Sequence, residues 1–155
     1  RMGIGRTFQS PRFMNRANIE DNLKVGTDLR NQHGYLQSFF GKKGYDFMAD
    51  LNELMEIAGF TFDWEDQITA LPYGQQKLLE IVRAMLARPT VILVDEPAAG
   101  LNKQEQDRVC QLLRKAVDSG MGVVLIGEFV IIPVSVKNQH RICMHKFSWA
   151  VAQTH

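Results

Sequence analysis

Apolar residues recur at spacings of three and four positions along much of the chain, which is the period of an amphipathic helix. Asn and Asp side chains often cap the first helical turn, whereas Gly and Pro often mark the end of a helix. With these signals the pattern predicts four helices, at about residues 18–26, 46–58, 74–88 and 102–119. The predicted caps at helix starts are Asn18, Asp46 and Asn102, and Gly59 is predicted to end the second helix. The segment from Thr27 to Tyr45 is rich in Gly, Asn and Gln and is predicted to be a loop.

Two shorter apolar runs predict β-strands. Residues 91–94 and 123–126 are each four consecutive apolar residues, too short for a helix and typical of parallel strands buried on both faces. A helix is predicted between them, and a strand, helix, strand order of this length favours parallel pairing. The second half of the chain is therefore expected to have an α/β fold.

Composition narrows the class of protein. The chain has 155 residues, of which 45% are hydrophobic, so it can form a globular domain with its own core. Its 18 basic and 17 acidic residues are interspersed, a balance without the electrostatic footprint expected for nucleic acid or an anionic membrane. No apolar stretch approaches the roughly 20 residues of a membrane span, so direct membrane insertion is not expected. Cys110 and Cys143 make no disulfide framework, which favours a reducing cytosol.

The strongest candidate chemistry follows the strand at residues 91–94. Asp95 and Glu96 come directly after it, and a parallel strand delivers such carboxylates to the sheet edge where ligands bind. Asp95 could hold Mg²⁺, and Glu96 could orient or deprotonate a water molecule. Ordinary α/β strands also end in acids, so this pattern alone is evenly balanced between a functional and a structural interpretation.

Gly74 is a second candidate because it opens a predicted helix. A glycine there lets backbone N–H groups and the positive end of the helix approach a phosphate. The alternative is a glycine that merely starts a helix.

Taken in order, three segments carry a specific resemblance. Residues 71–76 read Leu-Pro-Tyr-Gly-Gln-Gln, residues 91–97 read Val-Ile-Leu-Val-Asp-Glu-Pro, and residues 98–102 read Ala-Ala-Gly-Leu-Asn. This arrangement resembles the ATP-binding subunits of ABC transporters, and most of all the branched-chain amino acid importer group. The resemblance implies an α/β fold: a partial P-loop NTPase of the ABC nucleotide-binding type, with a mainly helical subdomain inserted after the Q-loop.

The resemblance covers residues 1–126 and implies one partial domain over residues 1–155. Its expected parts are a strand leading into the Q-loop, a helical subdomain that docks on the permease, a core with the signature, Walker B and D-loop motifs, and a divergent tail. These parts correspond to residues 1–10, 11–70, 71–126 and 127–155.

The resemblance also implies roles for single residues. Gln9 would complete the Mg²⁺ and water site and sense the γ-phosphate of ATP, Asp95 would hold Mg²⁺ through water, and Glu96 would activate the attacking water. The signature segment would contact the γ-phosphate of ATP bound to the opposing subunit, through Leu71, Pro72, Tyr73, Gly74, Gln75 and Gln76. The D-loop at residues 98–102 would link the two subunits' sites.

Several family features are missing from the sequence. It holds no G-x-x-x-x-G-K run followed by Ser or Thr, the P-loop that cradles phosphates. Gly127-Glu128-Phe129 stands where the family has Glu-His-Asp with its switch histidine. Pro72 replaces a serine that reaches the phosphate, and Leu78 replaces an arginine. From Phe129 onward no resemblance remains, which suggests a reading-frame shift or a chimeric gene.

The tail offers one further pattern. His140, Cys143 and His145 have a spacing that could supply soft metal ligands, but a fourth ligand is missing and incidental placement is favoured.

The leading hypothesis is the ATP-hydrolysing subunit of an ABC importer, for branched-chain amino acids, with ATP and Mg²⁺ as cofactors. Its partners would be transmembrane permease subunits and a second ATP-binding subunit, at the inner face of the cell membrane. The chain by itself is expected to be inactive as an ATPase. The alternatives are a non-catalytic permease-docking module and an inactive remnant. The transported solute itself is not encoded in these motifs.

Overall fold

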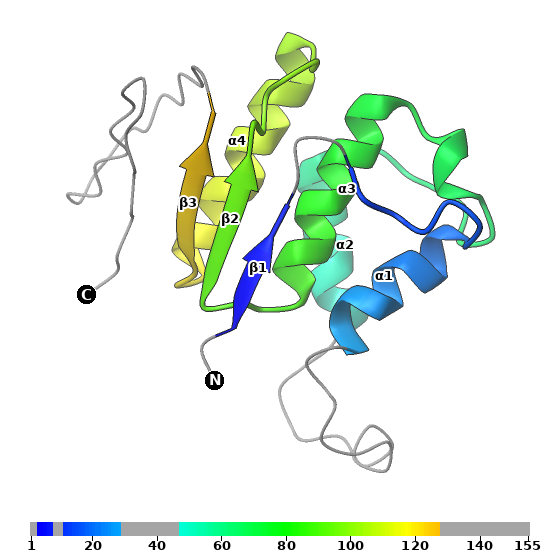
Figure 1. The fold of residues 1–155 in the computed structure, drawn as a ribbon, viewed down its shortest axis with the longest axis horizontal. Coiled ribbons are helices and arrows are strands. Elements are labelled where there is room, and N and C mark those ends of the chain that lie inside the picture. The colour runs from blue at the N-terminus through cyan, green and yellow to red at the C-terminus, as the bar shows by residue number, and fades with distance from the viewer. Residues whose placement is uncertain (1–2, 8–10, 29–46, 128–155) are drawn as a thin grey trace.

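The structure is a computed structural model that describes residues 3–7, 11–28 and 47–127 (Figure 1). Its elements along the chain are β1 (Ile4–Arg6), α1 (Ile19–Asp28), α2 (Phe47–Ala58), the 3-10 turn η1 (Ile68–Ala70), α3 (Tyr73–Leu86), β2 (Val91–Asp95), α4 (Lys103–Asp118) and β3 (Gly122–Ile126). No helix among these residues is both long and apolar enough to cross a membrane.

The described strands form one parallel sheet in the order β1-β2-β3. Ile4 of β1 lies opposite Val91 of β2, and Asp95 at the end of β2 lies opposite Ile126 of β3. The predicted parallel pairing of the two apolar runs is therefore confirmed. Figure 1 shows β2 in the middle of the sheet, α3 next to β1, and α1 on the far side of α3.

The strands are less buried than predicted. In β2, Ile92 and Val94 are fully buried, whereas Val91, Leu93 and Asp95 are only half-buried. Successive side chains of a strand point to opposite faces, so only one face of β2 faces the core formed with α3 and α4. The prediction of burial on both faces is wrong for this part of the chain.

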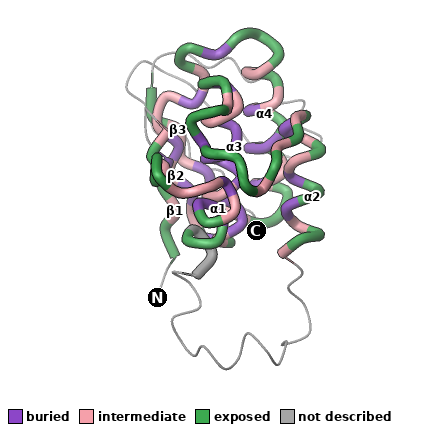
Figure 2. The backbone as a smooth tube through the Cα atoms, turned by 90° about the vertical axis from the view of Figure 1, so that its right-hand side faces the viewer, coloured by how far each residue is buried: buried purple, intermediate pink, exposed green. Residues whose placement is uncertain are grey.

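Helix α3 is the centre of the core. It packs against α1, α2, α4, β1 and β2, and Figure 2 shows buried backbone concentrated around it. Its buried residues are Gly74, Lys77, Leu78, Leu79, Glu80, Ile81, Val82, Met85 and Leu86. Because they cover most of the circumference, charged side chains of this helix are buried along with the apolar ones.

Most of the predicted helix ends are confirmed. The Asn18 side chain accepts a hydrogen bond from the Asp21 N–H (2.9 Å), which caps α1. Asn102 and Glu105 form a reciprocal capping box at the start of α4. Gly59 ends α2 in the left-handed conformation, with a φ of 69°, which a glycine adopts without strain.

Other helix boundaries differ from the predicted ones. Helix α1 continues to Asp28, so the predicted loop is wrong at its first two residues. Helix α3 begins at Tyr73, after Pro72, whose fixed φ and missing N–H suit the entrance of a helix. Most of the predicted loop, and the predicted cap Asp46, lie outside the described residues.

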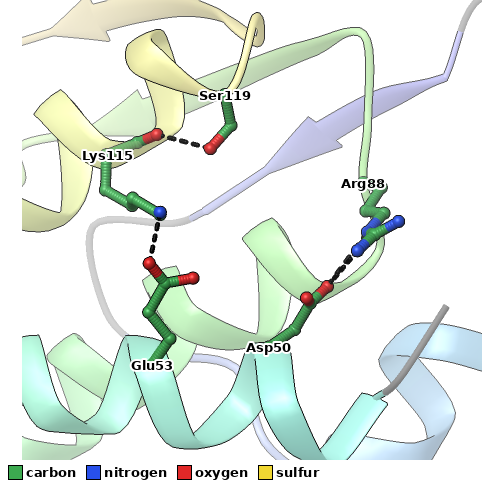
Figure 3. A network of polar contacts seen from close by, with 5 residues as sticks. All are labelled: Asp50, Glu53, Arg88, Lys115 and Ser119. Carbon is green, nitrogen blue, oxygen red and sulfur yellow. Dashed lines mark hydrogen bonds and ion pairs between the residues drawn. The ribbon is translucent and has the colours of Figure 1, made fainter. Parts of the chain in front are cut away.

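Two ion pairs join α2 to the core, Asp50 with Arg88 and Glu53 with Lys115 (Figure 3). They line a cavity of about 350 Å³ between α2 and the C-terminal ends of α3 and α4. All four side chains are partly exposed, so these pairs contribute little compared with the apolar contacts of α2.

The packing of α2 can be tested with two substitutions on the same helix. Leu51 is 1% exposed and Met48 is 47% exposed. We expect Leu51→Ala to lower the free energy of unfolding by about 2 to 5 kcal/mol, because it leaves a cavity in the core. Met48→Ala should change it by less than about 0.5 kcal/mol. Urea titrations of both variants check this, and equal losses would contradict the observed packing of α2.

Candidate functional site

The predicted acidic pair lies at the carboxyl edge of the sheet, where α/β sheets bind their ligands. Asp95 ends β2, and its carboxylate lies 3.7 Å from the Arg6 guanidinium of β1. The Thr7 hydroxyl oxygen accepts a 3.4 Å hydrogen bond from the Asp95 N–H, while the Thr7 N–H donates to the Leu93 carbonyl at 2.8 Å. The carboxyl ends of β1 and β2 are thus joined by these contacts, and Asp95 and Glu96 lie at this edge of the sheet.

Glu96 has an unusual backbone. Its φ is 43°, in the left-handed region that residues other than glycine seldom adopt. The Glu96 N–H donates to the Ile126 carbonyl at 2.6 Å, and the Glu96 carbonyl accepts from the Ala99 N–H at 3.2 Å. The chain therefore turns sharply out of the sheet at the residue expected to activate water. Such strained conformations persist only where the surroundings hold them.

Lys77 supplies one of those restraints. Its ammonium donates a 2.5 Å hydrogen bond to the Glu96 carbonyl and lies 5.9 Å from the centroid of the Tyr73 ring. The side chain is only 2% exposed. Burial lowers the pKa of Lys77 below its usual value, although the charges of Glu80, Glu96 and Asp95 oppose that shift. The sequence pattern did not predict a role for Lys77, because only the apolar positions of this helix entered the prediction.

The start of α3 also touches the D-loop segment and the start of α4. A Cβ atom added to Gly74 would lie 2.0 Å from a carboxylate oxygen of Glu105. Gly100 has a φ of 74°, and a Cβ there would lie 3.2 Å from the Tyr73 ring. Gly74 therefore has a packing role that does not depend on any ligand.

The rest of the signature segment surrounds this contact. Pro72 and Tyr73 are exposed, and Gln75 and Gln76 are half-buried. The Gln76 amide donates to the Leu71 carbonyl at 2.8 Å. Leu78, which replaces an arginine of the wider family, is fully buried in the core.

Two further charged residues of α3, Glu80 and Arg83, hold the segment that follows β1. The Arg12 N–H donates to a Glu80 carboxylate oxygen (3.3 Å), and the Arg83 guanidinium donates to the Arg12 carbonyl (2.8 Å). The same guanidinium stacks over the Phe13 ring, 4.5 Å from its centroid. The backbone just after residues 8–10 is thereby attached to α3. Gln9 itself lies outside the described residues.

The structure thus brings Asp95, Glu96 and the signature segment together around Lys77. Carboxylate oxygens suit Mg²⁺, which proteins commonly bind through one or two carboxylates plus substrate phosphates. Asp95 and Glu96 fit that donor chemistry. No cluster of three His, Cys, Asp or Glu side chains that could hold a metal occurs within residues 3–7, 11–28 and 47–127. The pattern at His140, Cys143 and His145 lies outside them.

Comparisons with known proteins point to one family. The family model described as ABC transporter matches residues 1–99. The high-affinity branched-chain amino acid transport ATP-binding protein BraF of Pseudomonas aeruginosa is 34% identical over 125 residues, which cover 74% of this chain and 47% of BraF. The corresponding protein LivG of Escherichia coli is 30% identical over 118 residues, covering 73% of this chain and 46% of LivG. The chain spans about half the length of these curated relatives.

Solved structures match the fold as well. An ATP-binding cassette of an ABC transporter, MJ1267, is 25% identical with a TM-score of 0.61, over 84% of this chain and 53% of that one. The dimeric ATP-binding cassette MJ0796, bound to ADP and Pi, is 22% identical with a TM-score of 0.66, over 84% of this chain and 54% of that one. The second likeness concerns the fold alone. The predicted fold class and the predicted resemblance are both confirmed.

The contact between Gly74 and Glu105 can be tested with a double-mutant cycle. We expect Gly74→Ala to lower the free energy of unfolding by about 1 kcal/mol, because the new methyl group displaces the Glu105 carboxylate from the capping box. In a Glu105→Ala background, the same substitution should be neutral or stabilising, since alanine favours helices over glycine. Additive effects in urea titrations would show that the two residues do not interact.

The buried ammonium of Lys77 predicts a pH dependence of stability. Because its pKa is lowered on folding, the unfolded chain binds more protons between the folded-state pKa and the ordinary lysine pKa of 10.5. The stability of the wild type relative to Lys77→Met should therefore rise as the pH increases through this window. Urea titrations from neutral pH upward measure the difference. Comparison with Lys103→Met should show no such rise, because the hydrogen bond to Asp107 raises the pKa of Lys103.

Proposed function

The chain belongs to the ABC transporter family, and from this we propose that it serves as the ATP-binding and ATP-hydrolysing part of an ABC importer. The observation that carries the proposal is the meeting of Asp95 and Glu96 with the signature segment at one edge of the sheet. Branched-chain amino acids are the proposed solutes, because BraF and LivG are named for their transport.

We assign the chemistry to the end of β2. Asp95 would hold Mg²⁺ through water, and the ion when bound neutralises charge on the phosphate oxygens. Glu96 would orient the attacking water and accept its proton. Gln9 is proposed to complete this site.

The signature segment would act on a second nucleotide. The first N–H groups of α3 lack partners within the helix and carry its positive dipole end, so they suit a γ-phosphate of ATP on an opposing subunit. Residues 71–76 supply this surface. Pro72 contributes no side-chain cap to it, so backbone donors would carry most of the contact.

The remaining parts are proposed from the same family membership. Residues 1–10 would lead into the Q-loop, residues 11–70 would form the permease-docking subdomain, residues 71–126 would form the catalytic core, and residues 127–155 a divergent tail. The protein would work as a pair of ATP-binding subunits, bound to transmembrane permease subunits at the inner face of the cell membrane.

The test isolates the complex through a tag on this chain and measures its Mg-dependent ATPase activity. We expect Glu96→Gln to lower kcat by about 10² to 10⁴, the usual contribution of a positioned general base. Glu56→Gln is the matched control, because Glu56 is an exposed glutamate on α2. Equal kcat values for the wild type and Glu96→Gln would rule out the proposed role of Glu96.

A non-catalytic permease-docking module is the second candidate. Pro72 lacks the hydroxyl of the family's serine, and the side chain of Leu78 is buried in the core instead of carrying a charge. The same purification separates the two functions. Permease subunits that co-purify with this chain in the absence of any ATPase activity would support the docking module.

A further inference from the structure

We propose that the buried side chain of Lys77 is a positioning residue, which holds the left-handed backbone of Glu96 and so fixes the direction of the Glu96 carboxylate. The functional part of this inference depends on the proposed role of Glu96 in hydrolysis. The structural part stands on contacts within the described residues.

The backbone of Glu96 is held on both sides of its Cα atom. Its N–H is bound to the Ile126 carbonyl of β3 at 2.6 Å, which attaches the residue to the sheet. Its carbonyl is bound to the Lys77 ammonium of α3 at 2.5 Å, which attaches the residue to the central helix. A rotation of Glu96 out of its φ of 43° would displace one or both of these groups.

Gly127, directly after β3, lies close to the other side of Glu96. A Cβ atom added to Gly127 would lie 3.0 Å from the Glu96 Cγ and 3.1 Å from its Cα. The Glu96 side chain therefore leaves the turn past a closely packed backbone. Once the Glu96 carbonyl is held by Lys77 and its N–H by Ile126, the direction of the Cα–Cβ bond from which the carboxylate extends is fixed.

Lys77 is suited to this role by its surroundings. Lysine is almost never fully buried unless its charge has a partner, and here the hydrogen-bond acceptor is the carbonyl of Glu96. The stem of Lys77 begins on α3, whose neighbouring residues Leu78 and Ile81 are held in the core with at most 1% exposure. The ammonium is thereby attached to the helix with the most buried residues in the described chain.

Amide hydrogen exchange tests the structural part without nucleotide. In Lys77→Met, the amides of Glu96 and Ala99 should exchange at least about tenfold faster relative to the amide of Val94, because a charge-assisted hydrogen bond at the turn is lost. Lys115→Met is the matched control, since Lys115 pairs with Glu53 beside the cavity. The control should leave the relative exchange at Glu96 and Ala99 unchanged. Unchanged relative exchange in Lys77→Met would overturn the inference.

A measurement on the wild type covers the case in which Lys77→Met does not fold. The ammonium protons of Lys77 should be visible in ¹⁵N-edited spectra at neutral pH, because the group is buried and hydrogen-bonded. Those of Lys103, an exposed residue of α4, should exchange too fast to be seen. Equal exchange of the two groups would overturn the inference.

The functional part is tested in the tagged complex. Lys77→Met should lower kcat at least about tenfold with little change in KM, and should have no further effect in a Glu96→Gln background, because both act through one carboxylate. Additive losses would overturn a positioning role. A complex without ATPase activity would refute the proposed function, whereas the exchange measurements would still decide whether Lys77 holds the turn.

Discussion

Burial on nearly every side of α3 is the constraint on which the other elements depend. The helix contacts α1, α2, α4, β1 and β2, and its apolar side chains form the centre of the common core. Burial of this extent also encloses Lys77, Glu80 and part of Arg83, whose charges are costly to remove from water. Each of these side chains has found a backbone group as partner, and each partner lies in a connection that follows a strand.

The charged residues of α3 therefore hold two connections, the one after β2 and the one beyond β1, by hydrogen bonds to their backbone. Lys77 binds the carbonyl of Glu96 after β2, while Glu80 and Arg83 bind the N–H and the carbonyl of Arg12 beyond β1. These hydrogen bonds attach each connection to the buried helix. The acids at the end of β2 and the backbone beyond residues 8–10 are therefore both attached to α3.

The sequence predicted the features that depend on local signals. Asn18 and Asn102 cap their helices as expected, because a capping side chain needs only the turn that follows it. Burial of both faces of β2 was predicted wrongly, since the layers that cover a strand are set by distant segments. Lys77 was missed for a related reason: its partner lies 19 positions away, and helical periodicity carries no information about such contacts. The nearly continuous apolar residues that follow it, from Leu78 to Leu86, were the available signal, because a helix buried all round must bury its charged residues too.

Gly74 shows how a local motif and a tertiary contact combine. A glycine at a helix start favours the approach of a phosphate, but here the Glu105 carboxylate occupies the space beside its Cα atom. Glu105 belongs to the capping box that starts α4, and Lys77, three residues after Gly74, binds the turn that leads there. Two separate contacts therefore join the beginning of α3 to residues 96–105. Under the proposed function these two segments face different nucleotides, and these contacts would link the two nucleotide sites within a single chain.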